Sequence, residues 1–284
     1  MSSIGALFET VPNISEGRDG SIIDECIGAM ESAGARVVHR TSDVAHNRSV
    51  LTAVGPREAV SEAAIALAGV TTRRIDLRVH RGVHPRIGAL DVLPFVPLKS
   101  ASLADAASLA REAAAEIWRR FRVPSYLYGD AATQDERRHL ANVRRGEFEG
   151  LSSRSDTPDV GEGMHPGAGA IAVGARPLLV AFNVDLASGD LAVAKEIAAV
   201  LRERGGGLGT LRAIGVMRAP GVAQVSFNIT DFVATPVYRI VELVRALAAE
   251  RGTGVARSEL IGLIPRRALT QSAAYYAHDG DALS

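Results

Sequence analysis

Side chains that can carry chemistry are concentrated in one short stretch of the chain. It reads His80-Arg81-Gly82-Val83-His84-Pro85-Arg86-Ile87-Gly88-Ala89 and contains two imidazoles and two guanidiniums. Gly82, Pro85 and Gly88 interrupt helical continuity, so the stretch is predicted to be a loop. Histidine titrates near neutral pH and is therefore suited to accept and donate protons. The sequence predicts an acid–base site on this loop.

A metal site is the alternative use of two histidines spaced four residues apart. On a helix, His80 and His84 would share one face, but Gly82 and Pro85 disfavour a helix here. The stretch also lacks the glutamate of a zinc-protease motif, and the single cysteine of the chain, Cys26, lies elsewhere. We therefore expect no metal. For His80, a strand-end histidine bonded to the backbone remains the alternative to a functional role.

The elements that must position this loop follow a repeated order. Helical and strand periodicities predict a βαββαβ unit, then a further strand, helix and strand, then a second βαββαβ unit. The first group has strands at about 6–13, 35–40, 48–54, 74–79, 89–97 and 124–128 and helices at about 18–34, 57–71 and 102–120. The second has strands at about 176–185, 211–217, 222–229 and 254–261 and helices at about 190–204 and 234–250.

This order predicts an α/β (α+β) protein with two ferredoxin-like lobes. The polar, glycine-containing segment 135–168 has weak periodicity and is predicted to be a linker. We therefore place one domain at 1–170, with the histidine loop, and another at 171–284.

The histidine stretch and its continuation, H-x-G-x-H-P-R-x-G-A-L-D-V-x-P-F-x-P, resemble the signature of glutamate formimidoyltransferases. Further matching segments occur in the family's order at 11–17, 47–50, 126–132, 145–149, 174–176, 181–184, 223–226 and 262–265. The resemblance implies two α/β subdomains with a substrate tunnel between them. It also implies a homodimer and transfer of a formimidoyl group from N-formimino-L-glutamate to N5 of tetrahydrofolate, a step of histidine breakdown. The larger members continue into a cyclodeaminase domain, so we expect that second activity to be absent from a chain of 284 residues.

The resemblance also indicates the site residues. His84 matches the family's catalytic histidine, and Asp43 is the carboxylate predicted to face the donor or to orient His84, although a simple turn role is equally compatible with it. The loop at 163–169 matches the segment that lines the folate site. The predicted substrate- and folate-binding residues are Asn13, Asn47, Arg48, His80, Arg86, Gly163, His165, Pro166, Gly167, Ala168 and Gly169. Arginines such as Arg81 and Arg176 are further candidates for binding carboxylates.

The implied reaction explains why a histidine is needed. The attacking nitrogen of tetrahydrofolate must lose a proton and the departing glutamate nitrogen must gain one, and one imidazole can do both through a tetrahedral intermediate. Two alternatives stay open. The donor can be another formimino compound such as formiminoglycine, or the chain can be a folate-binding protein without catalysis.

The composition and charge of the chain limit the kinds of partner that it can bind. Net formal charge is zero, so no global field attracts nucleic acid or a membrane surface. No apolar run approaches the roughly 20 residues of a membrane-spanning helix, and no secretory signal is apparent. We expect a cytoplasmic enzyme whose substrates are small molecules. Cys26 lies among apolar residues at helical spacing and is predicted to be a buried, unreactive thiol.

Overall fold

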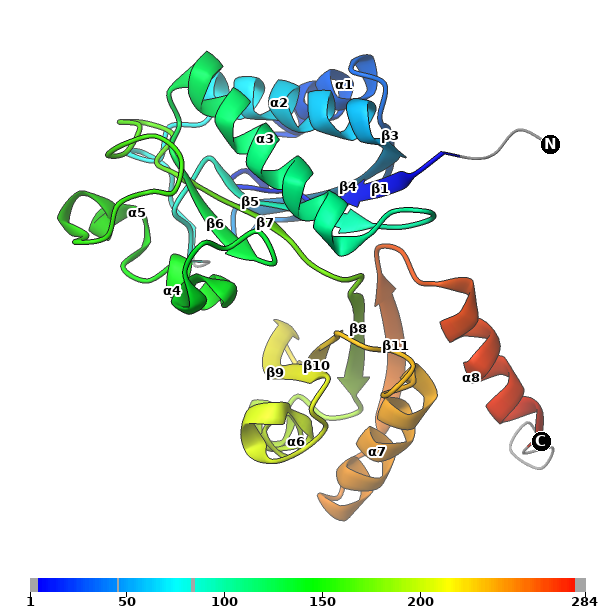
Figure 1. Ribbon diagram of the computed structural model, residues 1–284. Helices are drawn as coiled ribbons and strands as arrows, with labels where there is room; N and C mark the ends of the chain where they lie inside the picture. Colours follow the sequence, from blue (N-terminus) through cyan, green and yellow to red (C-terminus); the bar gives the residue numbers. More distant parts are fainter. Residues whose placement is uncertain (1–4, 45, 83–84, 279–284) are drawn as a thin grey trace. The chain divides into compact units, whose positions relative to one another are not determined.

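The computed structural model describes residues 5–44, 46–82 and 85–278. The chain forms two compact units, of which the first ends at Pro177 and the second begins at Leu178. Each unit contains one β-sheet with helices (Figure 1). Within the described ranges, no helix has both the length and the apolar character needed to cross a membrane.

The sheet of the first unit combines antiparallel and parallel strands. Its strands are β1 (Leu7–Thr10), β2 (Asn13–Ile14), β3 (Arg36–Asp43), β4 (Arg48–Pro56), β5 (Leu90–Pro97), β6 (Ser125–Gly129) and β7 (Ile171–Ala175). β1 and β2 both lie between β4 and β5, and β3 pairs with the outer side of β4. These pairings are antiparallel, whereas β7 pairs in parallel with β5 and β6.

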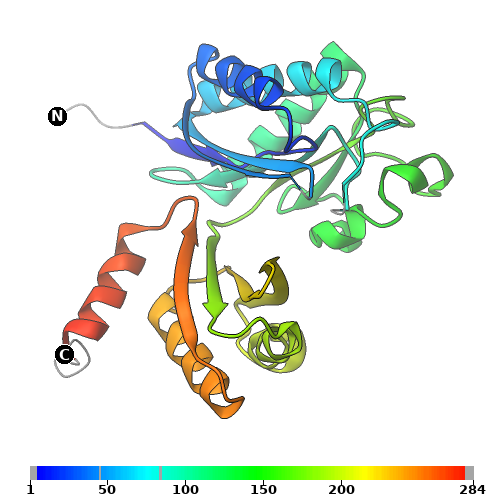
Figure 2. The same cartoon turned by 180° about the vertical axis from the view of Figure 1, so that it is seen from behind.

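Three long helices cover one face of this sheet, as Figure 1 and, from behind, Figure 2 show. They are α1 (Gly20–Ser32), α2 (Arg57–Arg74) and α3 (Leu103–Phe121). Ser102 begins α3 with a capping box, accepting a hydrogen bond from the Asp105 backbone N–H while the Asp105 carboxylate accepts one in return. Their apolar sides form a core with β1, β4, β5 and β7 that fully buries Phe8, Leu93 and Cys26.

The opposite face of the sheet is covered in part by the segment between β6 and β7, which contains the short helices α4 (Leu140–Val143) and α5 (Glu147–Gly150). A second apolar cluster forms there around Ile87, Tyr126 and Val143. The prediction of a linker at 135–168 is therefore wrong. The segment belongs to the first unit and packs on its sheet.

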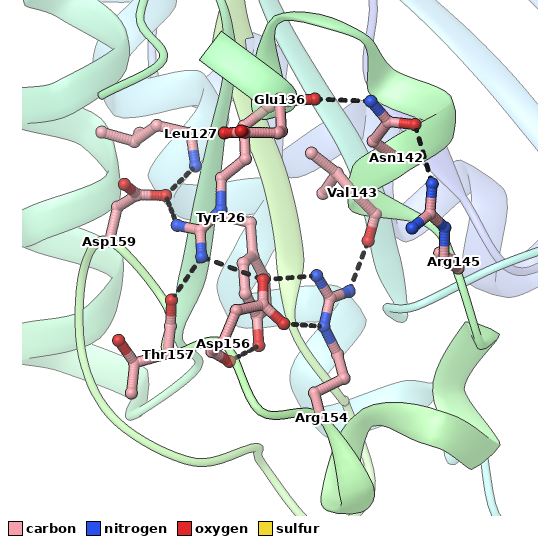
Figure 3. A network of polar contacts seen from close by, with 11 residues as sticks. Tyr126, Leu127, Glu136, Asn142, Val143, Arg145, Arg154, Asp156, Thr157 and Asp159 are labelled. Atoms are coloured by element: carbon pink, nitrogen blue, oxygen red, sulfur yellow. Dashed lines mark hydrogen bonds and ion pairs between the residues drawn. The ribbon is translucent and has the colours of Figure 1, made fainter. Parts of the chain in front are cut away.

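A polar network attaches this segment to β6 (Figure 3). The Tyr126 ring lies between two guanidiniums, with the carbon of Arg154 4.4 Å and that of Arg137 5.0 Å from the ring centroid. Arg137 is almost fully buried and donates to Asp159 at 2.5 Å and to Asp156 at 2.9 Å. Arg137 thus joins two parts of the segment, and the Asp159 carboxylate attaches the segment to β6 by accepting the Leu127 N–H at 2.8 Å.

The second unit has the predicted order. Its strands are β8 (Val180–Leu186), β9 (Leu211–Ala219), β10 (Val222–Ile229) and β11 (Val255–Ile261), with helices α6 (Leu191–Leu201) and α7 (Val237–Glu250). The sheet order β11-β8-β10-β9 is that of a ferredoxin-like unit. The same order recurs in the first unit as β5, β1 with β2, β4 and β3, so two α+β lobes are confirmed. A last helix, α8 (Arg266–His278), was not predicted.

Two further expectations differ from the structure. Residues 74–79 do not form a strand, because α2 continues to Arg74 and the backbone then turns, with the Asp76 carboxylate accepting the Arg78 N–H at 3.0 Å and its carbonyl accepting the His80 N–H at 3.0 Å. The boundary between units falls at 177/178 rather than at 170/171, because β7 is an inner strand of the first sheet.

Candidate functional site

A pocket of about 440 Å³ opens beside the histidine loop in the first unit. Its lining residues come from the segment just before α1, from the loop after α2 and from α5 and are Arg18, His80, Arg81, Gly82, Arg86, Glu147 and Glu149. The pocket thus presents three guanidiniums, one imidazole and two carboxylates. Such a mixture suits a ligand that carries both negative and positive charge.

His80 lies at the edge of this pocket and is held by both ring nitrogens. Its Nε2 lies 3.1 Å from the carbonyl oxygen of Asn47, and its Nδ1 lies 3.3 Å from Nε of Arg86. A carbonyl only accepts and a guanidinium only donates, so the ring carries its proton on Nε2 and is neutral. Burial and the nearby charge of Arg86 lower the pKa of His80, which agrees with a neutral ring. The backbone-bonded arrangement expected as the alternative for His80 is therefore present.

Arg86 makes the strongest ion pair of the pocket. Its two terminal nitrogens donate to the two carboxylate oxygens of Glu149 at 3.0 and 2.8 Å, and only 8% of its side chain is exposed. The hydrogen bonds from Arg86 also lower the pKa of Glu149. The Arg86 carbonyl accepts the Phe148 N–H at 2.8 Å, so α5 is joined to the histidine loop through backbone as well as side chains. Arg86 is predicted to bind substrate, but in the structure both terminal nitrogens of its guanidinium donate to Glu149.

Two close backbone approaches fix the entry to the histidine loop. Asn47 has a left-handed backbone (φ 48°), and its side chain accepts the Gly17 N–H at 2.9 Å and donates to the Arg81 carbonyl at 3.1 Å. Gly82 packs so tightly on the His46 carbonyl that a Cβ there would overlap it. Asn47 therefore joins three loops, which explains its burial without requiring contact with a ligand.

A buried charge cluster lies directly after the loop. Asp91 is fully buried and accepts hydrogen bonds from Arg48 and Arg144, both at 2.6 Å, and from the Ile87 N–H at 2.8 Å. Burial alone would raise the pKa of Asp91, but the two guanidiniums and the N–H together hold it below its ordinary value. Arg48 also donates to the side-chain oxygen of Asn13 at 2.8 Å. Arg48 and Asn13 thus support the base of the loop.

The two predicted catalytic residues have different outcomes. His84 lies outside the residues that the structure describes. Asp43 ends β3, and its carboxylate accepts the His46 N–H at 2.8 Å and lies 2.8 Å from His46 Nδ1. It does not line the pocket, and its side chain is about half exposed. This geometry is that of the turn residue considered for Asp43, and its catalytic role stays a prediction.

The predicted folate loop at 163–169 packs against the histidine loop from the first unit itself. Leu77 N–H donates to the Gly167 carbonyl at 2.8 Å, and Ala89 N–H donates to that of Ala168 at 3.0 Å. His165 Nδ1 accepts the Ala168 N–H at 2.9 Å, which stabilises the turn internally.

The loop's small residues have structural reasons. Gly169 has φ +71°, and a Cβ there would overlap the Ile87 carbonyl, while the Ala168 side chain is buried. Gly163 and Pro166 are exposed. None of 163–169 lines the pocket, so their contact with folate stays a prediction.

The described residues contain no group of three histidine, cysteine or acidic side chains that could hold a metal ion. The residues that sequence reasoning missed are Glu147, Glu149 and Arg18. The segment 145–149 resembles the family, but nothing in its composition alone assigns a role to its glutamates. Their proximity to a loop more than 60 residues earlier becomes visible only in the folded chain.

Two models of one protein family match nearly the whole chain. Residues 7–176 match the model of the formiminotransferase domain, N-terminal subdomain, and residues 181–283 match that of the formiminotransferase domain. The chain belongs to the formiminotransferase family. The two matched ranges coincide closely with the two structural units, and the histidine pocket lies in the N-terminal subdomain.

Curated relatives of this formiminotransferase cover nearly its whole length. A glutamate formimidoyltransferase of Streptococcus pyogenes is 41% identical over 95% of this chain and 93% of its own, and one of Thermoplasma acidophilum is 36% identical over 95% and 92%. The formimidoyltransferase-cyclodeaminase of Rattus norvegicus is 37% identical, and the match spans 52% of that longer protein. The chain is therefore an enzyme of the formimidoyl-transferring class.

Proposed function

We propose that this enzyme transfers the formimidoyl group of N-formimino-L-glutamate to N5 of tetrahydrofolate. The observation that carries the proposal is the mixed charge of the pocket beside the signature loop. The donor combines two carboxylates with a cationic formamidinium, and the pocket offers guanidiniums for the former and carboxylates for the latter. The names of the relatives mention glutamate and formimidoyl transfer, and the resemblance of the signature loop to the family adds tetrahydrofolate as the acceptor.

Arg18 and Arg81 are the guanidiniums proposed to bind the donor's carboxylates. Both are exposed, and neither forms an ion pair with a carboxylate of the described residues. Their hydrogen bonds go to backbone carbonyls, with Arg18 donating to Val44 at 3.0 Å and Arg81 to His80 at 2.7 Å. Two available guanidiniums favour a donor with two carboxylates over formiminoglycine, which has one.

His84 is proposed as the acid–base group, on the strength of its place in the signature between Gly82 and Arg86, both of which line the pocket. N5 of tetrahydrofolate attacks the amidine carbon, and a tetrahedral intermediate forms as the N5 proton passes to the imidazole. The same proton then passes to the glutamate nitrogen, the bond from that nitrogen to the amidine carbon breaks, and glutamate leaves. His80 cannot act as this acid–base group, because both of its ring nitrogens already form hydrogen bonds within the protein.

The test is an assay with tetrahydrofolate and a set of donors, namely N-formimino-L-glutamate, formiminoglycine and N-formimino-L-aspartate, following formation of 5-formimino-tetrahydrofolate. We expect the highest kcat/KM for the glutamate donor. A chain that binds tetrahydrofolate without turnover of any donor would instead support the alternative of a folate-binding protein. The homodimer, the cytoplasmic location and the place in histidine breakdown stay predictions.

A further inference from the structure

Glu147 occupies an unusual backbone position at the pocket. Gly146 and Glu147 are consecutive residues with left-handed backbone, at φ 83° and 55°. For glutamate this conformation is unfavourable, and such strain persists only where surrounding contacts impose it, often at functional sites. Here the Glu147 N–H donates to the Arg144 carbonyl at 3.0 Å and the next N–H, of Phe148, donates to Arg86. The backbone therefore holds Glu147 firmly at the pocket wall.

The two carboxylates of the pocket are not equivalent. Glu149 is engaged by both terminal nitrogens of Arg86. The Glu147 carboxylate lies 3.6 Å from Nη1 of Arg86, beyond hydrogen-bond distance, and 44% of its side chain is exposed. A carboxylate can accept about four hydrogen bonds, and Glu149, with 62% of its side chain exposed, uses two of these positions for Arg86, whereas Glu147 uses none for it. Glu147 is therefore the pocket carboxylate that is not committed to a hydrogen bond with Arg86.

A cationic ligand group would need such a partner. The pocket already contains three guanidiniums, and a further positive charge would be repelled unless an ionised carboxylate lay beside it. A formamidinium is planar and presents parallel N–H groups, so it can bind a carboxylate through two hydrogen bonds as a guanidinium does. A neutral N-formyl group has a carbonyl oxygen in place of that cation and gains nothing from a carboxylate.

We propose that Glu147 binds the formamidinium of the donor and makes the site select formimino over neutral N-acyl compounds. The proposal rests on the proposed function for the identity of the donor. It assigns to Glu147 the part that sequence reasoning gave to Asp43, whose carboxylate is bonded to the 43–46 turn and does not line the pocket. Because the Glu147 carboxylate would bind a nitrogen attached to the amidine carbon, it would also orient that carbon for attack.

The test compares two ligands that differ only at this group, N-formimino-L-glutamate and N-formyl-L-glutamate. Their dissociation constants are measured calorimetrically without tetrahydrofolate, so that no turnover occurs. We expect the wild-type enzyme to prefer the formimino compound. In Glu147→Gln, we expect formimino binding to weaken about 10- to 100-fold, as for loss of a hydrogen bond between charged groups, and formyl binding to stay within about threefold. The preference should be partly restored in Glu147→Asp.

The matched control is Glu31→Gln, the same chemical change on an exposed residue near the end of α1, which should leave both constants unchanged. Retention of the full formimino preference in Glu147→Gln would overturn the assignment. Equal loss of both ligands would also overturn it, since that result indicates a structural role. A wild-type enzyme that transfers no formimidoyl group and binds neither ligand would refute the proposed function itself, and is distinguishable from these outcomes before any variant is made.

Discussion

Replacement of Asp91 by alanine should strongly destabilise the first unit. The carboxylate is fully buried and accepts hydrogen bonds from Arg48, Arg144 and the Ile87 N–H. Alanine would leave two guanidiniums, of which 9% and 18% is exposed, facing each other without an anion. Removal of one partner from a buried ion pair typically costs about 3–5 kcal/mol. For a unit of this size, that corresponds to a fall in Tm of roughly 6–20 °C.

The assay is thermal unfolding followed by tryptophan fluorescence. Trp118 is the sole tryptophan of the sequence and lies in α3, so the signal reports the first unit alone. The matched control is Asp24→Ala, which removes an equally short ion pair, to Arg40, from the surface, where 69% and 51% of the two side chains are exposed. Because solvent screens such pairs, the control should shift the Tm by no more than about 2 °C.

The pH dependence supplies the sign of the effect. The pKa of Asp91 is depressed in the folded state, so its ionised form stabilises the protein above the unfolded pKa of about 3.9, and that stabilisation is lost as pH falls through the folded value. The difference in Tm between wild type and Asp91→Ala should therefore be largest near neutral pH and shrink below about pH 4. If the variant melts within 2 °C of wild type at pH 7, the cluster contributes no net stability and the reasoning is refuted.

The remaining predictions concern His84, metal chelators, two glycines of the 163–169 loop and the thiol of Cys26. His84→Ala should lower kcat about 10²- to 10⁴-fold at saturating substrates, with the Trp118-reported Tm unchanged; a near wild-type kcat would exclude His84 as the acid–base group. EDTA or phenanthroline should leave activity unchanged, whereas loss that zinc reverses would require a metal mechanism. Gly167→Ala should be tolerated structurally, because its Cβ would meet only the Asp76 carboxylate at ordinary contact distance, and a selective rise in the KM for tetrahydrofolate would support the predicted folate loop. Gly169→Ala should instead lower the Tm, since the new Cβ would overlap a backbone carbonyl. Cys26 should resist Ellman's reagent in the native enzyme and react fully in denaturant, because burial raises the pKa of its thiol to about 12.

Most of the secondary structure was predictable because local signals agreed with the tertiary contacts. The helical periodicity predicted a helix at about 102–120, and the structure has α3 there, begun by Ser102. The strand predicted at 74–79 does not form, although apolar and polar residues alternate there. Asp76 follows a long helix and stabilises a turn instead, by accepting hydrogen bonds from the N–H groups of Arg78 and His80. The linker prediction for 135–168 was wrong because the segment is held by ion pairs, such as Arg137 with Asp159, and by scattered apolar side chains, such as Val143, which together leave no hydrophobic period in the sequence.

For the site, the sequence located the histidine loop correctly but not its partners. Arg86 was predicted to bind a ligand, and its pairing with Glu149 depends on a contact between residues 63 positions apart. Likewise Arg48 was predicted to bind a substrate carboxylate, but in the folded chain its guanidinium donates to Asp91. A residue's type shows which bonds it can make. Only the tertiary structure shows which of them are already satisfied within the protein and which remain for a substrate.

The place of β7 in the first sheet has a consequence for how this protein is made. β7 is the last strand of its unit to be synthesised, yet it lies between β5 and β6 and provides the strand partner of β6. Until residues 171–175 have left the ribosome, β5 presents an open parallel edge and β6 has no ladder at all. Open edges of this kind promote pairing between chains. A fragment ending at residue 170 should therefore aggregate, whereas one ending at 177 should fold, and during synthesis the unit must wait for its final strand.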